Sequence, residues 1–329
     1  MTNRRLLPAI ALLLAVTTAA CSGGGDDRPP APSTGSGVDA STFAAEVAST
    51  DLAVNRPERV EVGVFSSTSD SGVQLLTFGK VQLAFTYLGS DGSATPQPGP
   101  TVIAAYLPAP GTDANGTTPT LMSPDQARGV YQAEDVTFDH AGIWTVAVST
   151  DIQDLGSLSL DSTFSVKPKP SLPAPGDEAL ATKNLTIGSK GVDPVSIDSR
   201  AQGDQPIPDP QLHRWTIADA LKQGRPALVL FATPVYCISR FCGPDTDALA
   251  GLAKAYPDRA VYIHIEIWKD FDHSVANQAA VDWLYRDGDL TEPWLYLIGA
   301  NGMILDRWGP VFDADEVAAE LADLPAMKS

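Results

Sequence analysis

The sequence is poor in cysteine, with three residues in 329, and this scarcity limits the redox chemistry available to the chain. Basic residues are also few: 22 lysines and arginines stand against 40 aspartates and glutamates, which gives a formal net charge of −18. Such an acidic chain is repelled by nucleic acid and by anionic lipid head groups, so we expect neither as a partner. The apolar run Leu6–Val16 is too short to cross a bilayer as a helix.

The first twenty residues have the layout of a secretory signal, with a basic start at Arg4 and Arg5, an apolar run and small residues up to Ala20. Cys21 follows directly, and this arrangement resembles a bacterial lipoprotein signal, although Thr18 stands where that motif usually has Leu. The resemblance implies that residues 1–20 are removed and that a lipid on Cys21 anchors the chain to the extracytoplasmic face of the cell membrane. An ordinary cleaved signal with an incidental cysteine is the alternative.

The remaining cysteines form one candidate pair, Cys237 and Cys242, in an oxidising compartment where disulfides persist. Residues 21–42 are rich in Gly, Ser, Pro and Asp, a composition typical of a flexible tether.

Between residues 43 and 166 the chain is built from short alternating runs separated by turn residues. Val81, Leu83, Phe85 and Tyr87 fall on one face of the clearest run. Seven such runs predict an all-β sandwich of the immunoglobulin-like kind. They are Val60–Phe65, Val73–Phe78, Val81–Tyr87, Thr101–Leu107, Gly129–Phe138, Ile143–Thr150 and Leu158–Val166.

A proline-rich stretch, Lys167–Gly176, marks the best domain boundary, and we assign residues 167–211 to a linker and an irregular segment. Residues 212–329 form the second predicted domain, with the element order α-β-α-β-α-β-β-α. The expected helices are Thr216–Gly224, Pro244–Tyr256, Ser274–Arg286 and Asp313–Leu321, and the expected strands are Ala227–Ala232, Ala260–Ile267, Trp294–Ile298 and Met303–Trp308.

The two cysteines lie where the predicted strand Ala227–Ala232 gives way to a helix beginning at Pro244, near the positive end of its macrodipole. A thiolate is stabilised at such a position and becomes a nucleophile. Five residues of ideal helix rise about 7.5 Å, beyond the roughly 4.4–6.8 Å between Cα atoms that a disulfide accepts. A Cys237–Cys242 bond therefore requires a loop ahead of the helix.

This corner, with Tyr236-Cys237, a second cysteine and Gly243-Pro244, resembles the active site of the thioredoxin-like superfamily. The resemblance implies an α/β thioredoxin-like domain, a mixed central sheet with helices on both faces, and a cis bond before Pro293 beside the cysteines. One departure separates the chain from that family: thioredoxins have two residues between their cysteines, whereas this chain has four.

The leading functional interpretation is thiol–disulfide exchange with exported protein thiols and disulfides, without a cofactor. Cys237 would attack, Cys242 would resolve the mixed disulfide, and Pro293 would lie beside them. A structural disulfide in a non-catalytic interaction module is one alternative. The other resembles the Sco copper-delivery proteins, with copper held by Cys237, Cys242 and a histidine, His264 or His273; Sco cysteines, however, are separated by three residues.

Overall fold

The computed structural model describes residues 39–112, 116–203 and 205–327. The predicted signal peptide, Cys21 and most of the predicted tether lie outside these ranges. Among the helices within them, none combines the length and hydrophobicity that crossing a membrane requires.

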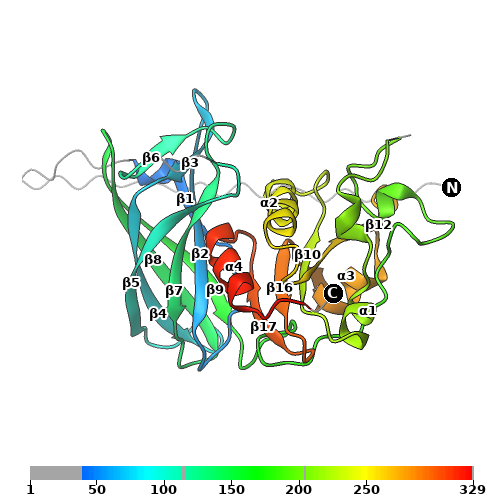
Figure 1. The fold of residues 1–329 in the computed structure, drawn as a ribbon. Coiled ribbons are helices and arrows are strands. Elements are labelled where there is room, and N and C mark those ends of the chain that lie inside the picture. The colour runs from blue at the N-terminus through cyan, green and yellow to red at the C-terminus, as the bar shows by residue number, and fades with distance from the viewer. Residues whose placement is uncertain (1–38, 113–115, 204, 328–329) are drawn as a thin grey trace, which may run out of the picture. The chain divides into compact units, whose positions relative to one another are not determined.

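The first part of the chain forms one antiparallel sheet of nine strands, in the order β6-β3-β2-β7-β5-β4-β8-β9, with β1 paired to β2 (Figure 1). A short 3₁₀ turn, Ala40–Thr42, precedes it. Its strands are β1 Phe43–Val47, β2 Glu58–Thr68, β3 Gly72–Thr77, β4 Lys80–Gly89, β5 Gln97–Pro108, β6 Thr120–Met122, β7 Gly129–Val136, β8 Gly142–Ile152 and β9 Gly156–Val166.

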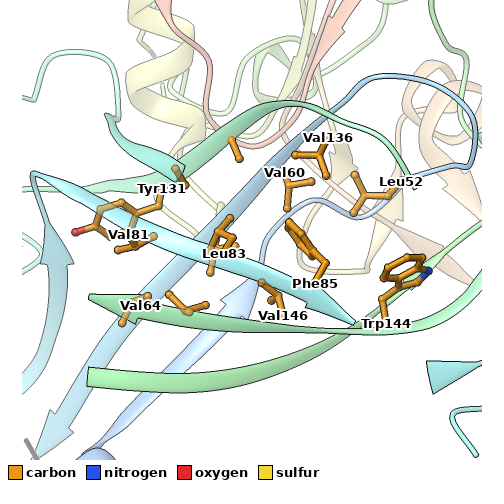
Figure 2. Packing of buried hydrophobic residues seen from close by; sticks show 14 of the residues in the cluster. Leu52, Val60, Val64, Val81, Leu83, Phe85, Tyr131, Val136, Trp144 and Val146 are labelled. Carbon is orange, nitrogen blue, oxygen red and sulfur yellow. The ribbon is translucent and has the colours of Figure 1, made fainter. Parts of the chain in front are cut away.

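Alternate residues of these strands build a single core inside the curled sheet (Figure 2). Val81, Leu83 and Phe85 are buried, as the alternation in β4 predicts. Trp144 of β8 packs edge to face against Phe138, and its indole N–H donates to the carbonyl of residue 140 at 2.9 Å. Burial of these aromatic side chains supplies much of the hydrophobic free energy of this part.

The expected immunoglobulin-like sandwich is therefore wrong. Strand β5 pairs with β4 on one side and with β7 on the other. In a sandwich the strands would divide into two separate sheets, whereas here hydrogen bonds connect them all in one sheet. The result is a large curled antiparallel sheet that encloses its own core.

The second part contains a four-stranded sheet in the order β11-β10-β16-β17, with β10 parallel to β11 and antiparallel to β16. Leu228 and Leu230 of β10 enter one hydrophobic cluster with α2 and α4, while Val229 and Phe231 enter another with α1 and α3. The strands are β10 Ala227–Ala232, β11 Val261–Glu266, β16 Trp294–Ile298 and β17 Ile304–Trp308, and the helices are α1 Ile217–Lys222, α2 Cys242–Ala255, α3 Gln278–Leu284 and α4 Ala314–Asp323.

The expected thioredoxin-like fold class is also wrong. Over the described residues the structure is predominantly β, with 40% strand against 16% helix, a large curled antiparallel sheet and only four α-helices. The expected helix Ser274–Arg286 illustrates why: Ser274 has a left-handed φ of 55° in the turn between two short strands, and only Gln278–Leu284 is helical. Short hairpins flank this helix, β12 Trp268–Asp270 with β13 Val275–Ala276, and β14 Tyr285–Arg286 with β15 Asp289–Leu290.

The proline-rich stretch packs against the rest of the chain around one buried carboxylate, Asp51. Arg307 of β17 donates to Asp51 Oδ2 at 2.8 Å, and Lys167 donates to Oδ1 at 2.9 Å. Burial alone would raise the pKa of Asp51, but the Arg307 charge and hydrogen bonds from Ser171 lower it to about 2. Asp51 is thus held as an anion that depends on its partners.

Candidate active site

Strand β10 and helix α2 position the two cysteines. All six residues of β10 are buried, and the chain then turns at Pro234 into an exposed loop. The backbone N–H of Cys237 donates to the carbonyl of Thr233 at 3.1 Å, which fixes the start of this loop. Helix α2 begins at Cys242 itself, two residues before the predicted start. Cys237 is consequently half-buried at the loop, whereas Cys242 is fully buried in the first turn of the helix.

Both cysteines are free thiols. The carboxyl group of Glu292, two residues before β16, lies beside them. The sulfur atoms of Cys237 and Cys242 and a carboxylate oxygen of Glu292 lie within 4.8 Å of one another. The Cys242 thiol donates a hydrogen bond to Glu292 Oε2, and Cys237 Sγ lies 3.1 Å from the hydroxyl oxygen of Ser239. The loop between the cysteines therefore allows the close approach that a continuous helix would prevent.

The environment makes the two thiols different. The neighbouring Cys242 side chain, followed by the Ser239 hydroxyl and the backbone N–H groups of Cys242 and Arg240, lowers the pKa of Cys237 to about 5. Burial raises the pKa of Cys242 far above its usual range, and the neighbouring Cys237 and the charge of Glu292 raise it further. At neutral pH Cys237 is a thiolate and Cys242 a protonated thiol, which is the division of roles that exchange chemistry requires.

Glu292 accepts the hydrogen bond of the Cys242 thiol and is therefore placed to take its proton. Burial, and then the negative charge of Cys237, raise the pKa of the Glu292 carboxyl to about 8. The peptide bond between Glu292 and Pro293 is cis, as the sequence predicts. The sequence predicts Pro293 beside the cysteines but not a role for the Glu292 carboxyl group, whose only signal is an acidic residue directly before Pro293.

No family model matches the chain, and no curated protein matches it. The chemistry of the site must therefore be argued from its geometry.

Two more buried acids were missed: Asp245 lies near the cysteines, and Glu61 lies near Asp245. Asp245, in the first turn of α2, is fully buried, and within the described ranges neither of its carboxylate oxygens has a hydrogen-bond partner. Burial, followed by the charges of Glu61, Cys237 and Glu292, raises the pKa of Asp245 well above its usual range. Glu61 of β2 is also buried, and burial raises its pKa to about 8. These shifts favour the protonated form of both carboxyl groups.

The two histidines proposed as copper ligands lie elsewhere. His264 of β11 is buried and hydrogen-bonds the carbonyl of Ala232 at 3.1 Å, and its other nitrogen faces Asp198. His273 is exposed and pairs with Asp270 at 2.8 Å. The structure brings Cys237, Cys242 and the Glu292–Pro293 segment together, and it groups His264 with a different set of side chains.

Apolar side chains are exposed around the cysteine loop. Ile238, next to the nucleophilic thiol, is 96% exposed, and Val235 on the other side of it is also exposed. The ring of Tyr236 stacks on that of Phe271, with 4.0 Å between their centroids. An apolar rim of this kind around a thiolate suits the docking of a polypeptide better than that of a small polar molecule.

Proposed function

We propose that this protein is a thiol–disulfide oxidoreductase, tethered to the extracytoplasmic face of the membrane, that reacts through Cys237 and Cys242. The observation that carries the proposal is the asymmetry of the pair: an accessible thiol with its pKa lowered to about 5 beside a buried thiol with its pKa raised. A purely structural disulfide has no need of such a difference between its two sulfur atoms.

In the first step the Cys237 thiolate attacks one sulfur of a substrate disulfide. A bond forms between Cys237 and that sulfur, the substrate S–S bond breaks, and the other substrate sulfur leaves as a thiolate that takes a proton from water. The exposed Ile238 and Val235 supply apolar contact for the substrate chain at this stage.

In the second step Cys242 resolves the mixed disulfide. Its proton passes to the Glu292 carboxylate along their hydrogen bond. The resulting thiolate attacks the sulfur of Cys237, the Cys237–Cys242 disulfide forms, and the second substrate sulfur leaves as a thiolate. In balance the substrate disulfide is reduced by two electrons and the protein dithiol is oxidised; the reverse sequence oxidises a substrate dithiol.

The reduction potential of the Cys237–Cys242 couple tests this proposal. A working pair should have a potential above about −300 mV, measured by equilibration with a redox buffer, because structural disulfides of exported proteins typically fall below that value. A potential well below it would favour a permanent disulfide and an interaction module instead.

Anchoring through Cys21 is a separate part of the proposal and rests on the lipoprotein-like signal. The mature protein isolated from membranes should carry a diacylglyceryl-type adduct on Cys21 by intact-mass analysis, and the adduct should be lost in Cys21→Ser. An unmodified chain that begins at another residue would contradict the anchor while leaving the exchange chemistry untouched.

A further inference from the structure

Three ionisable side chains from separate segments meet in the interior beneath the cysteine loop. Asp198 follows the 3₁₀ turn Pro194–Ser196, His213 ends the 3₁₀ turn Pro210–His213, and His264 lies in β11. All three are fully or almost fully buried, and they offer ligand atoms within 4.8 Å of one another. The proposed exchange reaction uses none of them.

The hydrogen bonds of His264 leave one of its nitrogens without a suitable partner. Its Nε2 lies 3.1 Å from the carbonyl oxygen of Ala232, and since a carbonyl only accepts, Nε2 carries the hydrogen. In the neutral ring Nδ1 then carries no hydrogen and presents a lone pair. It faces Asp198 Oδ2 at 3.6 Å and has no hydrogen-bond partner among the described residues. Two electron-rich atoms facing each other in a dry interior repel unless a cation, either a metal ion or a proton, lies between them.

The spacing of these atoms fits a tetrahedral metal ion. Asp198 Oδ2 is 3.2 Å from His213 Nε2 and 3.6 Å from His264 Nδ1. A Zn²⁺ ion with bonds of about 2.0–2.1 Å holds its ligand atoms about 3.3–3.4 Å apart when the angles are tetrahedral. The two distances from Asp198 Oδ2, 3.2 and 3.6 Å, lie on either side of that value.

The groups behind two of the three ligands, His264 and Asp198, also match a metal site. A ligating histidine commonly donates its second N–H to a backbone carbonyl, as His264 does to Ala232. The other carboxylate oxygen of Asp198 is held by the backbone N–H and Nε of Arg200, at 2.9 and 3.1 Å. These contacts fix the orientation of both ligands before any ion binds.

Charge around the cluster is compatible with a divalent cation. The guanidinium of Arg200 donates to Asp198 Oδ2 at 2.8 Å, and it also contacts Asp209 at 3.0 Å and Asp247 at 3.3 Å, so three carboxylates share its charge. Glu266, buried in the same strand as His264, accepts the backbone N–H of Ser199 at 2.8 Å. Carboxylates therefore outnumber the one guanidinium in and around the cluster.

We propose that Asp198, His213 and His264 bind a divalent first-row transition-metal ion, such as Zn²⁺, in a structural site. Imidazole nitrogen and carboxylate oxygen are ligands suited to ions of this class. The site would hold the base of the cysteine loop, because Ala232 immediately precedes the loop and the N–H of Val235 donates to Ser199 Oγ at 3.2 Å.

Metal titration of the full chain carrying Cys237→Ser and Cys242→Ser tests the proposal, because that variant removes the two thiols of the candidate active site. Metal-stripped protein should take up one equivalent of Zn²⁺ with a rise in thermal midpoint, and Co²⁺ should give the visible absorption of a tetrahedral N/O site. His264→Gln and His213→Gln should each weaken Zn²⁺ binding by at least about 100-fold. His273→Gln, at an exposed histidine, is the matched control and should leave binding unchanged.

Failure of the histidine-intact protein to take up stoichiometric Zn²⁺ or Co²⁺ would overturn the proposal, and it would indicate that a proton bridges His264 and Asp198 instead. Uptake that persists unchanged in a folded His264→Gln variant would overturn it as well. Neither result bears on thiol exchange, because the tested protein lacks both cysteines.

Discussion

Replacing Glu292 with Gln isolates the second step of the exchange reaction, since the amide keeps the size of the side chain but cannot take a proton. In the reduced protein, burial and the Cys237 thiolate hold the pKa of Glu292 at about 8, so about one tenth of it is ionised at pH 7. Once Cys237 enters a mixed disulfide its charge is gone, and the pKa of Glu292 falls. The carboxylate becomes available when Cys242, whose pKa burial raises, must lose its proton.

General-base catalysis contributes about 10²–10⁴-fold to rate, so Glu292→Gln should slow resolution of the mixed disulfide by about 100-fold or more. Attack by Cys237 should be nearly unchanged, because its low pKa comes from Cys242, Ser239 and backbone N–H groups. In the wild type, resolution should quicken with rising pH until Glu292 is fully ionised, and this dependence should be lost in the variant.

The assay is acid-quenched reaction with glutathione disulfide followed by mass spectrometry. The glutathionylated intermediate should accumulate in Glu292→Gln but stay transient in the wild type and in the matched control Glu46→Gln, at an exposed position of β1. If Glu292→Gln resolves the intermediate as fast as the wild type, Glu292 is not the proton acceptor.

Three further predictions follow from other contacts. Cys242→Ala should raise the pKa of Cys237 from about 5 toward the ordinary value of about 8.5, seen as the midpoint of the pH–rate profile for alkylation; a midpoint still near 5 would contradict the assigned cause. Arg307→Met should lower the free energy of unfolding by about 1.5–3 kcal/mol in urea denaturation, because it removes the hydrogen bond of one of the two cations paired with the buried Asp51 carboxylate, and a loss below about 0.5 kcal/mol would be inconsistent with this. Leu83→Ala should cost about 2–5 kcal/mol, whereas Ile103→Ala, exposed on the adjacent strand, should change stability by less than about 0.5 kcal/mol; equal effects would refute the described core.

Many local features of this structure can be predicted from the sequence. The strands Ala227–Ala232 and Trp294–Ile298 occupy their predicted residues, because continuous apolar runs bounded by turn residues specify buried strands. The convergence of Cys237, Cys242 and the Glu292–Pro293 segment was likewise expected.

The way in which the strands assemble into sheets could not be predicted from the sequence, for physical reasons. Alternation in a strand such as β4 says which side chains are buried, but one curled sheet and two stacked sheets both bury alternate residues. The helix expected from Ser274 onward forms only over Gln278–Leu284, because the residues before it pair as strands β12 and β13. A short helix has little stability of its own, so such strand pairing can replace its first turn.

The buried acids of the site escaped prediction for two reasons. Glu61 comes from a distant part of the chain, where it lies between the buried Val60 and Val62 and breaks the alternation of β2, and Asp245 has the sequence position of an ordinary first-turn helix acid. Asp198 and His213 lie in segments without a regular apolar pattern. Only the fold shows that Asp245 lies near the cysteines and that Asp198 and His213 lie beside His264.

The most direct test of the exchange proposal is the capture of a substrate by single-cysteine variants in native membranes, read by non-reducing electrophoresis. Cys242→Ser should trap a mixed disulfide on Cys237, because the resolving thiol is gone, whereas Cys237→Ser should trap far less, because Cys242 is buried and protonated. Equal destabilisation of both variants by about 2–4 kcal/mol, with no adduct on either, would contradict the account and identify a structural pair.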